Sequence, residues 1–473
     1  MATQTLKKLT PEELKNIQGI IISGYGHLPN SEYQFLATSD TSLAKNWLAA
    51  IIPKITTAHR PDDENGKKKK PGCALNIAFT YAGIKKFGPA FVSGFSQEFA
   101  EGITEPHRTR RLGDDGNSAP ELWDIKEEGV HILLIIQAPN IEERDTFSNE
   151  LKSDYTRFGI SLVKSEYGNQ PPNNKEHFGF TDSISQPFIE HSPATPKGTQ
   201  SCVRAGEFIL GYHNEYELLP ATPTIKATDD KNDYLPGLST DNNLKDFGCN
   251  GSYLVFRKLY QDVAGFNSYL DANTKSAEHK ALVAAKFVGR WPSGTPLVIS
   301  PDIDIPDVND KNNFFFMNND AKGLSCPIAS HIRRSNPRDS LAGNQEQSIK
   351  TVNRHRLLRR GIQYGQPFPG GSLDDGQDRG ILFLCVNADI KRQFEFVQQT
   401  WINNPKFGDM YNDRDPIAGN NFDPRGDNSG KEYNMTIPSS VREVFTGIPR
   451  FVQVKGGGYF FLPAIPALKY LTV

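Results

Sequence analysis

The first half of the chain changes its hydrophobic period several times, and each change marks an expected element. Short apolar or alternating runs predict strands, and apolar positions three to four residues apart predict helices. The expected order is a strand at 17–26, a helix at 42–55, a strand running into a short helix at 75–88, a strand at 130–139, a helix at 141–159 and a strand at 160–168. With the short helix set aside, this is the βαββαβ order of ferredoxin-like folds.

The second half repeats the same kinds of element with larger insertions between them. We expect a strand at 251–261, a helix at 276–291, a strand at 380–390, a helix at 391–402 and a closing hairpin at 450–463. In the helix at 391–402, Phe394, Val397 and Trp401 share one face, which is typical of core packing.

These patterns predict an α+β protein of two similar halves, although no clear sequence repeat relates them. Each half is expected to be a ferredoxin-like domain, an antiparallel β-sheet with flanking helices. The predicted domains are 1–215 and 216–473, and the boundary is softest in the turn-rich stretch 170–240.

Composition narrows the possible partners and compartment. The 473 residues include 53 basic and 55 acidic side chains, and a net charge of -2 argues against nucleic acid or an anionic membrane as partner. The N-terminus lacks the apolar core of about 7 to 15 residues of a secretory signal, and no later run reaches the roughly 18 apolar residues of a membrane span. We therefore expect a cytoplasmic protein, either monomer or dimer.

The cysteines agree with a reducing compartment. They are odd in number, scattered and never in a CxxC pair, so the sequence indicates neither a disulfide framework nor a zinc knuckle. No CxxCH motif for thioether-attached haem occurs. The five positions are Cys73, Cys202, Cys249, Cys326 and Cys385.

Familiar catalytic motifs do not account for this sequence. The dinucleotide-binding, P-loop, serine-elbow and zincin patterns are all missing from the sequence. His213 and Glu215 could begin a two-histidine, one-carboxylate iron site, although a turn after a strand is the favoured explanation of the pair.

The segment 326–340 offers a better candidate, because it places His331 directly before three arginines, Arg333, Arg334 and Arg338. Nearby cations disfavour an imidazolium, so the expected state is a neutral imidazole that a metal can bind. The arginines could meet anionic groups such as haem propionates. A hydrogen-bonded structural histidine is the alternative.

Several longer segments together resemble the dye-decolourising peroxidases, in the order of that family and over most of the chain. They are 111–124, 177–188, 205–216, 250–263, 330–339, 354–365 and 381–401. The resemblance implies two ferredoxin-like domains of the dimeric α+β barrel type and one non-covalent haem b per chain.

Carried over position by position, the resemblance implies a set of site residues. His331 corresponds to the proximal iron ligand, and Asp389 to the carboxylate that accepts a hydrogen bond from it. Asp182, in the motif that begins at Gly179, corresponds to the distal acid, and Arg359 to the distal arginine. The resemblance also assigns cofactor binding to Arg338, Phe256 and Phe383.

The implied activity is a haem-dependent peroxidase that reduces hydrogen peroxide and oxidises bulky aromatic donors such as dyes and phenols. Asp182 would move a proton between the two peroxide oxygens, and Arg359 would stabilise the charge on the departing one, leaving a ferryl porphyrin radical. Local roles remain open: Asp182 could cap a turn, Arg359 could be solvated, and Asp389 could cap the helix that follows it.

One residue departs from the family motif, because Ser183 stands where the motif closes with glycine. If this position requires a positive φ, the added Cβ carries strain that glycine avoids. Ser183 therefore keeps a second hypothesis open, a haem-binding or haem-delivery protein with little peroxidase turnover.

Overall fold

The computed structural model describes residues 8–62, 68–88, 90, 92–193, 196, 198, 201–341, 343–371, 373–421, 434–439 and 441–473. Its centre is a ten-stranded sheet with the strand order β12-β14-β11-β17-β2-β4-β1-β5, while β13 pairs with β14 and β3 with β17. The strands are β1 (Asn30–Thr38), β2 (Ala74–Phe79), β3 (Ile125–Lys126), β4 (Ile132–Ala138), β5 (Ile160–Asn169), β11 (Ser252–Gln261), β12 (Leu358–Arg359), β13 (Ile362–Tyr364), β14 (Gly380–Asn387) and β17 (Val452–Leu462).

Both halves of the chain contribute to this one sheet. β17 pairs antiparallel with β11 along its length and reaches β2 of the first half at Phe461 and Phe79. The sheet curves, so that β13 near one end of the order lies against β5 at the other. One face thereby encloses an apolar core to which Tyr33, Leu133, Phe256 and Leu384 contribute.

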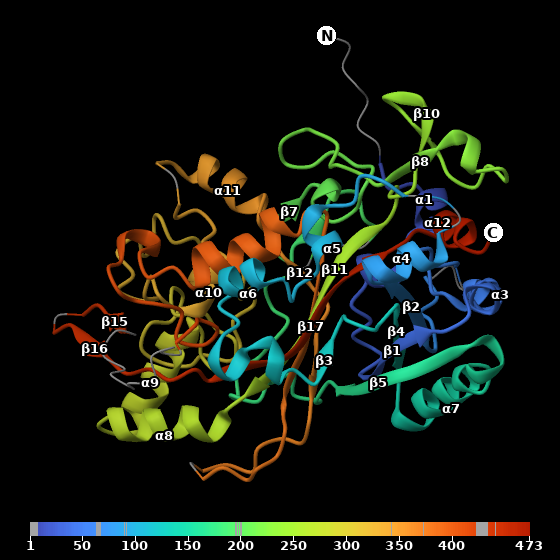
Figure 1. Cartoon of the computed structure of the whole chain (residues 1–473). Helices are drawn as coiled ribbons and strands as arrows, with labels where there is room; N and C mark the ends of the chain where they lie inside the picture. Colours follow the sequence, from blue (N-terminus) through green and yellow to red (C-terminus); the bar gives the residue numbers. More distant parts are fainter. Residues whose placement is uncertain are drawn as a thin grey trace.

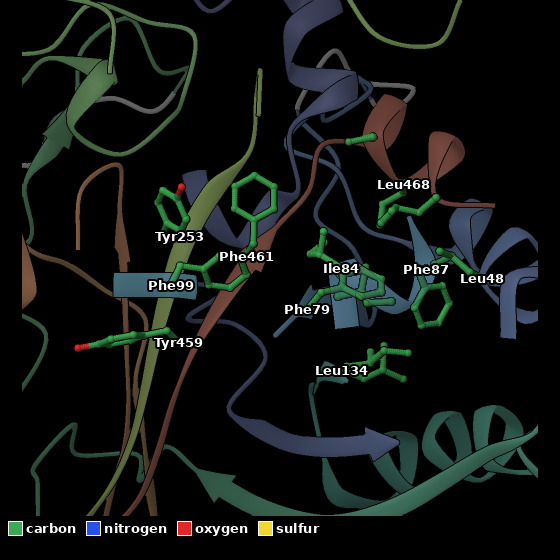
Figure 2. Packing of buried hydrophobic residues seen from close by; sticks show 14 of the residues in the cluster. Leu48, Phe79, Ile84, Phe87, Phe99, Leu134, Tyr253, Tyr459, Phe461 and Leu468 are labelled. Carbon is green, nitrogen blue, oxygen red and sulfur yellow. The ribbon is translucent and has the colours of Figure 1, made fainter. Parts of the chain in front are cut away.

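The outer face carries a second core, covered in the first half by helices. Figure 2 shows Phe79, Ile84, Phe87 and Leu134 gathered there, with Leu468 from the end of the chain beside them. The covering helices are α3 (Thr41–Ile51), α4 (Tyr81–Phe87), α7 (Ile141–Lys152) and α12 (Ile465–Tyr470).

The other helices gather over the second-half strands, on the far side of the long strands β11 and β17 from α3 and α7 (Figure 1). Helix α9 illustrates how they form: the Ser276 side chain caps its start, and Gly289, with φ of 96°, ends it. This group comprises α6 (Pro106–Leu112), α8 (Val263–Asn273), α9 (Ala277–Val288), α10 (His331–Ser335), α11 (Gln345–Asn353), η7 (Lys391–Glu395) and η8 (Val397–Ile402).

Shorter α-helices and small sheets lie around these elements. The remaining α-helices are α1 (Pro11–Asn16), α2 (Gly19–Ile22) and α5 (Gln97–Glu101). Three small sheets pair β6 (Phe188–Ile189) with β7 (Cys202–Val203), β10 (Asp241–Asp246) with β8 (Thr224–Lys226) and β9 (Gly237–Leu238), and β15 (Met435–Ile437) with β16 (Glu443–Phe445). The described residues include no helix long and apolar enough to cross a membrane.

Most expected elements are confirmed, but the first strand and the closing hairpin are wrong. Residues 17–26 contain the short helix α2, and the strand follows as β1. Periodicity misses this because a short, fully buried apolar run fits a helix or a strand equally well.

The predicted hairpin at 450–463 is the single long strand β17. Its three glycines, Gly456, Gly457 and Gly458, lie within the strand rather than in a turn, and other residues pack closely against them. A Cβ at Gly456 would lie 2.8 Å from Ile125, and one at Gly457 would lie 3.1 Å from Trp123. The glycines therefore make room for β3, which pairs with β17 there.

Residues 391–402 form two π-helical segments, η7 and η8, rather than a regular α-helix. Phe394, Val397 and Trp401 are buried, which confirms the expected core packing. A π-helix has more residues per turn than an α-helix, so these side chains do not share one face. Phe394 packs in the sheet core, whereas Val397 and Trp401 pack in a separate cluster.

Candidate active site

A cavity of about 330 Å³ lies between the second-half strands and the helices that cover them. Side chains of β11 point alternately to its two faces. Tyr253 and Val255 lie on the outer face and pack in the core. Further along the same face, Arg257, Leu259 and Gln261 line the cavity. Phe383 and Phe394 add an aromatic wall. Six of the described arginines line this cavity: Arg257, Arg290, Arg338, Arg356, Arg359 and Arg450.

His331 begins α10 and faces this cavity. Its Nδ1 lies 2.8 Å from Oδ2 of Asp415, a fully buried carboxylate whose Oδ1 accepts hydrogen bonds from the backbone N–H groups of Ile417 and Ala418. An ionised carboxylate can only accept, so Nδ1 carries the proton. Nε2 makes no hydrogen bond with any described residue, and its lone pair is available to a metal.

His331 and Asp415 each favour the charged form of the other. Burial opposes ionisation of Asp415, but His331 and the two backbone donors outweigh it and lower the pKa of Asp415. For His331, burial opposes protonation, but the Asp415 carboxylate outweighs it and raises the pKa of the imidazole. The raised pKa is opposite in direction to the shift expected of a free imidazole beside arginines alone.

The arginines after His331 explain this difference, because two of them point away from the cavity. Arg333 donates to the carbonyl oxygens of Asp320 and Cys326, and Arg334 donates to those of Trp401 and Asn404. Both guanidinium groups hold loops together.

Arg338 does line the cavity. Its guanidinium lies 3.8 Å from the centre of the Phe314 ring and donates to the carbonyl oxygens of Asn312 and Phe314. Burial and the nearby Arg290 hold the pKa of Arg338 well below its ordinary value. A buried cation whose hydrogen bonds go to neutral carbonyls is well suited to an anionic ligand.

Asp182 and Arg359 meet across the cavity, with 3.7 Å between Oδ1 and Nη1. Oδ1 of Asp182 also accepts a hydrogen bond from the N–H of Ser183. Ser183 has φ of 63°, so the position does adopt the left-handed conformation in which glycine is favoured. The backbone N–H of Arg359 donates to the Gln186 side chain, which fixes β12 beside this turn.

Phe383 lines the cavity, but Phe256 does not, and its assignment to cofactor binding is wrong. On β11, Arg257 is the residue that pairs with Phe383 and shares its face. Phe256 is one residue earlier, so it points to the opposite face and packs against Tyr33 and Phe35.

The assignment of Asp389 as the partner of His331 is also wrong, because Asp415 takes that position. Oδ1 of Asp389 instead accepts a hydrogen bond from the backbone N–H of Arg392, as the capping alternative predicts. Asp415 lies in the stretch Asp413–Arg414–Asp415–Pro416, which has no catalytic motif to mark it.

Glu176 is a cavity residue that sequence reasoning did not identify. Burial raises its pKa to about 7, against hydrogen bonds that favour the ionised form. Its only sequence signal is its position directly before the 177–188 segment.

The alternative iron site at His213 and Glu215 finds no support. The Glu215 carboxylate accepts a hydrogen bond from the backbone N–H of Arg204. Among the residues that the structure describes, no group of three or more His, Cys, Asp or Glu side chains is placed to hold a metal.

Comparison with known proteins places this cavity in context. The family model described as the DyP dimeric alpha+beta barrel domain matches residues 16–172. The chain is 30% identical to "Dye-decolorizing peroxidase AauDyP1" of Auricularia auricula-judae, over 96% of this chain and 86% of that protein. It is also 30% identical to "Dye-decolorizing peroxidase" of Mycena epipterygia, over 97% of this chain and 87% of that one.

Solved structures give the same result. An ancestral D-type dye decolorizing peroxidase superposes with a TM-score of 0.78 at 29% identity, covering 96% of this chain and 98% of that one. A dye-decolorizing peroxidase in complex with 2,6-dimethoxyphenol superposes with a TM-score of 0.76 at 26% identity, covering 97% and 99%.

Proposed function

This chain belongs to the dye-decolourising peroxidase family, and we propose that it reduces hydrogen peroxide while oxidising bulky aromatic donors such as dyes and phenols. The observation that carries the proposal is that one cavity holds both a carboxylate-bound histidine and an aspartate–arginine pair. The phenol complex of a relative supports the donor class.

The family consists of haem enzymes, and the residues present fit that group. His331 offers Nε2 as an iron ligand, Arg338 offers a buried cation for a haem carboxylate, and Phe383 offers an apolar wall. No cysteine is among the described residues that line the cavity, which favours non-covalent binding, and we propose one haem b per chain. When bound, the haem iron supplies the two-electron chemistry that cleaves the peroxide O–O bond.

The chain's own residues then divide the work. Hydrogen bonding to Asp415 orients the His331 ring and makes it a more basic ligand. Oδ1 of Asp182 already accepts from Ser183, so Oδ2 is the atom that takes a proton from peroxide and returns it to the leaving oxygen. Arg359 stabilises the negative charge that develops during cleavage.

A haem-binding or haem-delivery protein with little turnover is the second candidate, and a partial match favours it. The chain is 32% identical to "Deferrochelatase" of Escherichia coli, but over only 23% of this chain and 20% of that protein. Ser183 adopts its left-handed φ without separating Asp182 from Arg359, which favours the peroxidase.

The deciding experiment is stopped-flow absorption of the haem-reconstituted protein mixed with one equivalent of hydrogen peroxide. We expect rapid loss of Soret intensity in the wild type and a decrease of about 10²- to 10⁴-fold in that rate for Asp182→Asn and Arg359→Leu. His331→Ala should loosen haem, measured by haem titration. A Soret spectrum that peroxide barely alters would favour the haem-delivery alternative.

Partners and compartment remain part of the proposal. Hydrogen peroxide and aromatic donors are the proposed partners, without nucleic acid or membrane, in a monomer or dimer. All five cysteines are free thiols, which supports a cytoplasmic location.

A further inference from the structure

The turn that carries Asp182 is organised around a second carboxylate of the cavity, that of Glu176. We propose that Glu176 is a positioning residue that holds the Asp182 carboxylate in place for proton transfer. This inference rests on the proposed role of Asp182.

Three hydrogen bonds reach the Glu176 carboxylate, all from donors that lie in or next to the turn. Oε1 accepts from the backbone N–H of Phe180 at 2.9 Å. Oε2 accepts from the backbone N–H of Phe178 at 2.9 Å and from the side-chain amide of Gln261 at 2.6 Å. One side chain thus fixes the turn at two points and ties it to the last residue of β11.

The turn needs this support because its backbone is strained. Between 174 and 183, Asn174, Gly179 and Ser183 all have positive φ, of 56°, 95° and 63°. Such conformations are costly for residues other than glycine and persist when the surroundings fix them. The backbone N–H of Asp182 donates to the carbonyl of Asn174 across the same turn, so the position of Asp182 depends on the shape that Glu176 maintains.

The chemistry of the three donors calls for a carboxylate. An ionised carboxylate only accepts hydrogen bonds, whereas an amide of the same shape has one accepting oxygen and a nitrogen that donates. Glu176→Gln would therefore place an N–H against at least one donor of the turn. Both oxygens of Glu176 are engaged by N–H groups, which distinguishes a positioning role from a direct role in accepting the peroxide proton.

A further contact holds the turn from outside. Thr181 donates through its backbone N–H and its hydroxyl to the carbonyl of Pro292. No described residue forms an ion pair with Glu176, so the residue does not serve as half of a structural salt bridge. Its polar contacts all serve the turn and the adjoining strand end.

The test measures cyanide association with the ferric, haem-reconstituted protein by the Soret shift. Hydrogen cyanide must lose its proton as it binds iron, so its rate reports the distal base without turnover. The proteins are the wild type, Glu176→Gln, Asp182→Asn and the double variant. Glu128→Gln is the matched control, because Glu128 is exposed and lies outside the cavity.

We expect Glu176→Gln to slow association by roughly 10- to 100-fold, the scale of a small misplacement of a reacting group. In the Asp182→Asn background, the same change should alter the rate less than about twofold, because its effect acts through Asp182. Glu128→Gln should match the wild type.

Two results would overturn the inference: an unchanged rate in Glu176→Gln, or an equal slowing with and without Asp182. If Asp182→Asn alone leaves the rate unchanged, Asp182 is not the distal base, and the inference about Glu176 fails with it. The single variant therefore distinguishes this failure from a failure of the Glu176 role alone. Thermal unfolding of each apoprotein checks folding. If Glu176→Gln does not fold, Gln261→Leu decides, since it removes one bond to Glu176 and should produce a smaller slowing that also disappears without Asp182.

Discussion

Asp415 sets the state of the candidate iron ligand through the way its two oxygens are used. One accepts from His331 and the other from two backbone N–H groups, so the carboxylate is both oriented and kept ionised. Asp389 has the same side chain, but it lies at a helix start and its oxygens are directed to Arg392. Residue type alone does not separate these two roles.

Replacing Asp415 tests this assignment directly. We expect Asp415→Asn to weaken haem affinity or the peroxide reaction by about 10- to 100-fold, because the ring loses its charged acceptor. Haem titration and stopped-flow absorption measure the two effects. Asp389→Asn is the matched control, since asparagine caps a helix as well as aspartate does. A loss with Asp389→Asn and none with Asp415→Asn would reverse the assignment.

Ser183 is a single-residue strain that substitution can relieve. Its φ of 63° costs about 1 to 2 kcal/mol for a residue with a Cβ. Glycine removes this cost, but it also raises the conformational entropy of the unfolded chain, which offsets part of the gain in stability. Ser183→Gly should therefore raise the free energy of unfolding by about 0.5 kcal/mol. Urea denaturation measures the change, and a lower stability would show that the serine contributes a favourable contact.

Among the elements, α10 is held in place by Arg334 rather than by its own length. It spans only His331–Ser335, too short to be stable alone. The buried guanidinium of Arg334 donates to the carbonyls of Trp401 and Asn404 and to that of Asp413. It thus joins the helix that bears His331 to the segment that bears Asp415.

Arg334→Lys tests this connection. Lysine keeps the charge but cannot reach several carbonyls with one planar group, so buried acceptors lose partners. We expect the free energy of unfolding to fall by about 2 to 3 kcal/mol, measured by urea denaturation of the apoprotein. The exposed Arg110→Lys should change it by less than about 0.5 kcal/mol. Equal effects of the two variants would contradict this role for Arg334.

At the scale of the whole molecule, the two halves share their sheet and their cores. The Glu127 carboxylate also links the two halves, because it accepts hydrogen bonds from the backbone N–H of Ile103 in the first half and of Tyr459 in the second. Figure 1 shows α12, at the end of the chain, among the first-half helices. A boundary near residue 215 stays a prediction, and it would cut through the sheet and the cores that both halves share.

Glu127 also predicts a pH dependence of stability. Burial raises its pKa in the folded protein from 4.5 to about 7, so between these values the folded state binds more protons than the unfolded state. Stability contributed by this group therefore falls as pH rises through this window. Relative to Glu127→Gln, which does not titrate, the wild-type apoprotein should lose up to about 3 kcal/mol between pH 4.5 and 7. Urea denaturation across pH measures the difference, and a flat or rising difference would contradict the prediction.

The fold class, most helices and strands, and five residues that meet in one cavity can be predicted from the amino-acid sequence. The five residues are His331, Asp182, Arg359, Arg338 and Phe383. Periodicity and contiguous motifs suffice there because hydrophobic patterning and short segments are local properties of the chain. The same local reasoning failed for α2 and β17, where burial on all sides and close approach of another strand, rather than period, set the conformation.

Three features of the site depend on contacts between distant segments: which carboxylate meets His331, which arginines face the cavity and which face of β11 lines it. Asp415 is 84 residues from His331 along the chain, and their contact depends on how η8 and α10 pack together. Arg333 and Arg334 adjoin the ligand in sequence but turn toward neighbouring loops, because buried carbonyl oxygens there require donors. Such pairings follow from the packing of distant segments, and no local pattern encodes them.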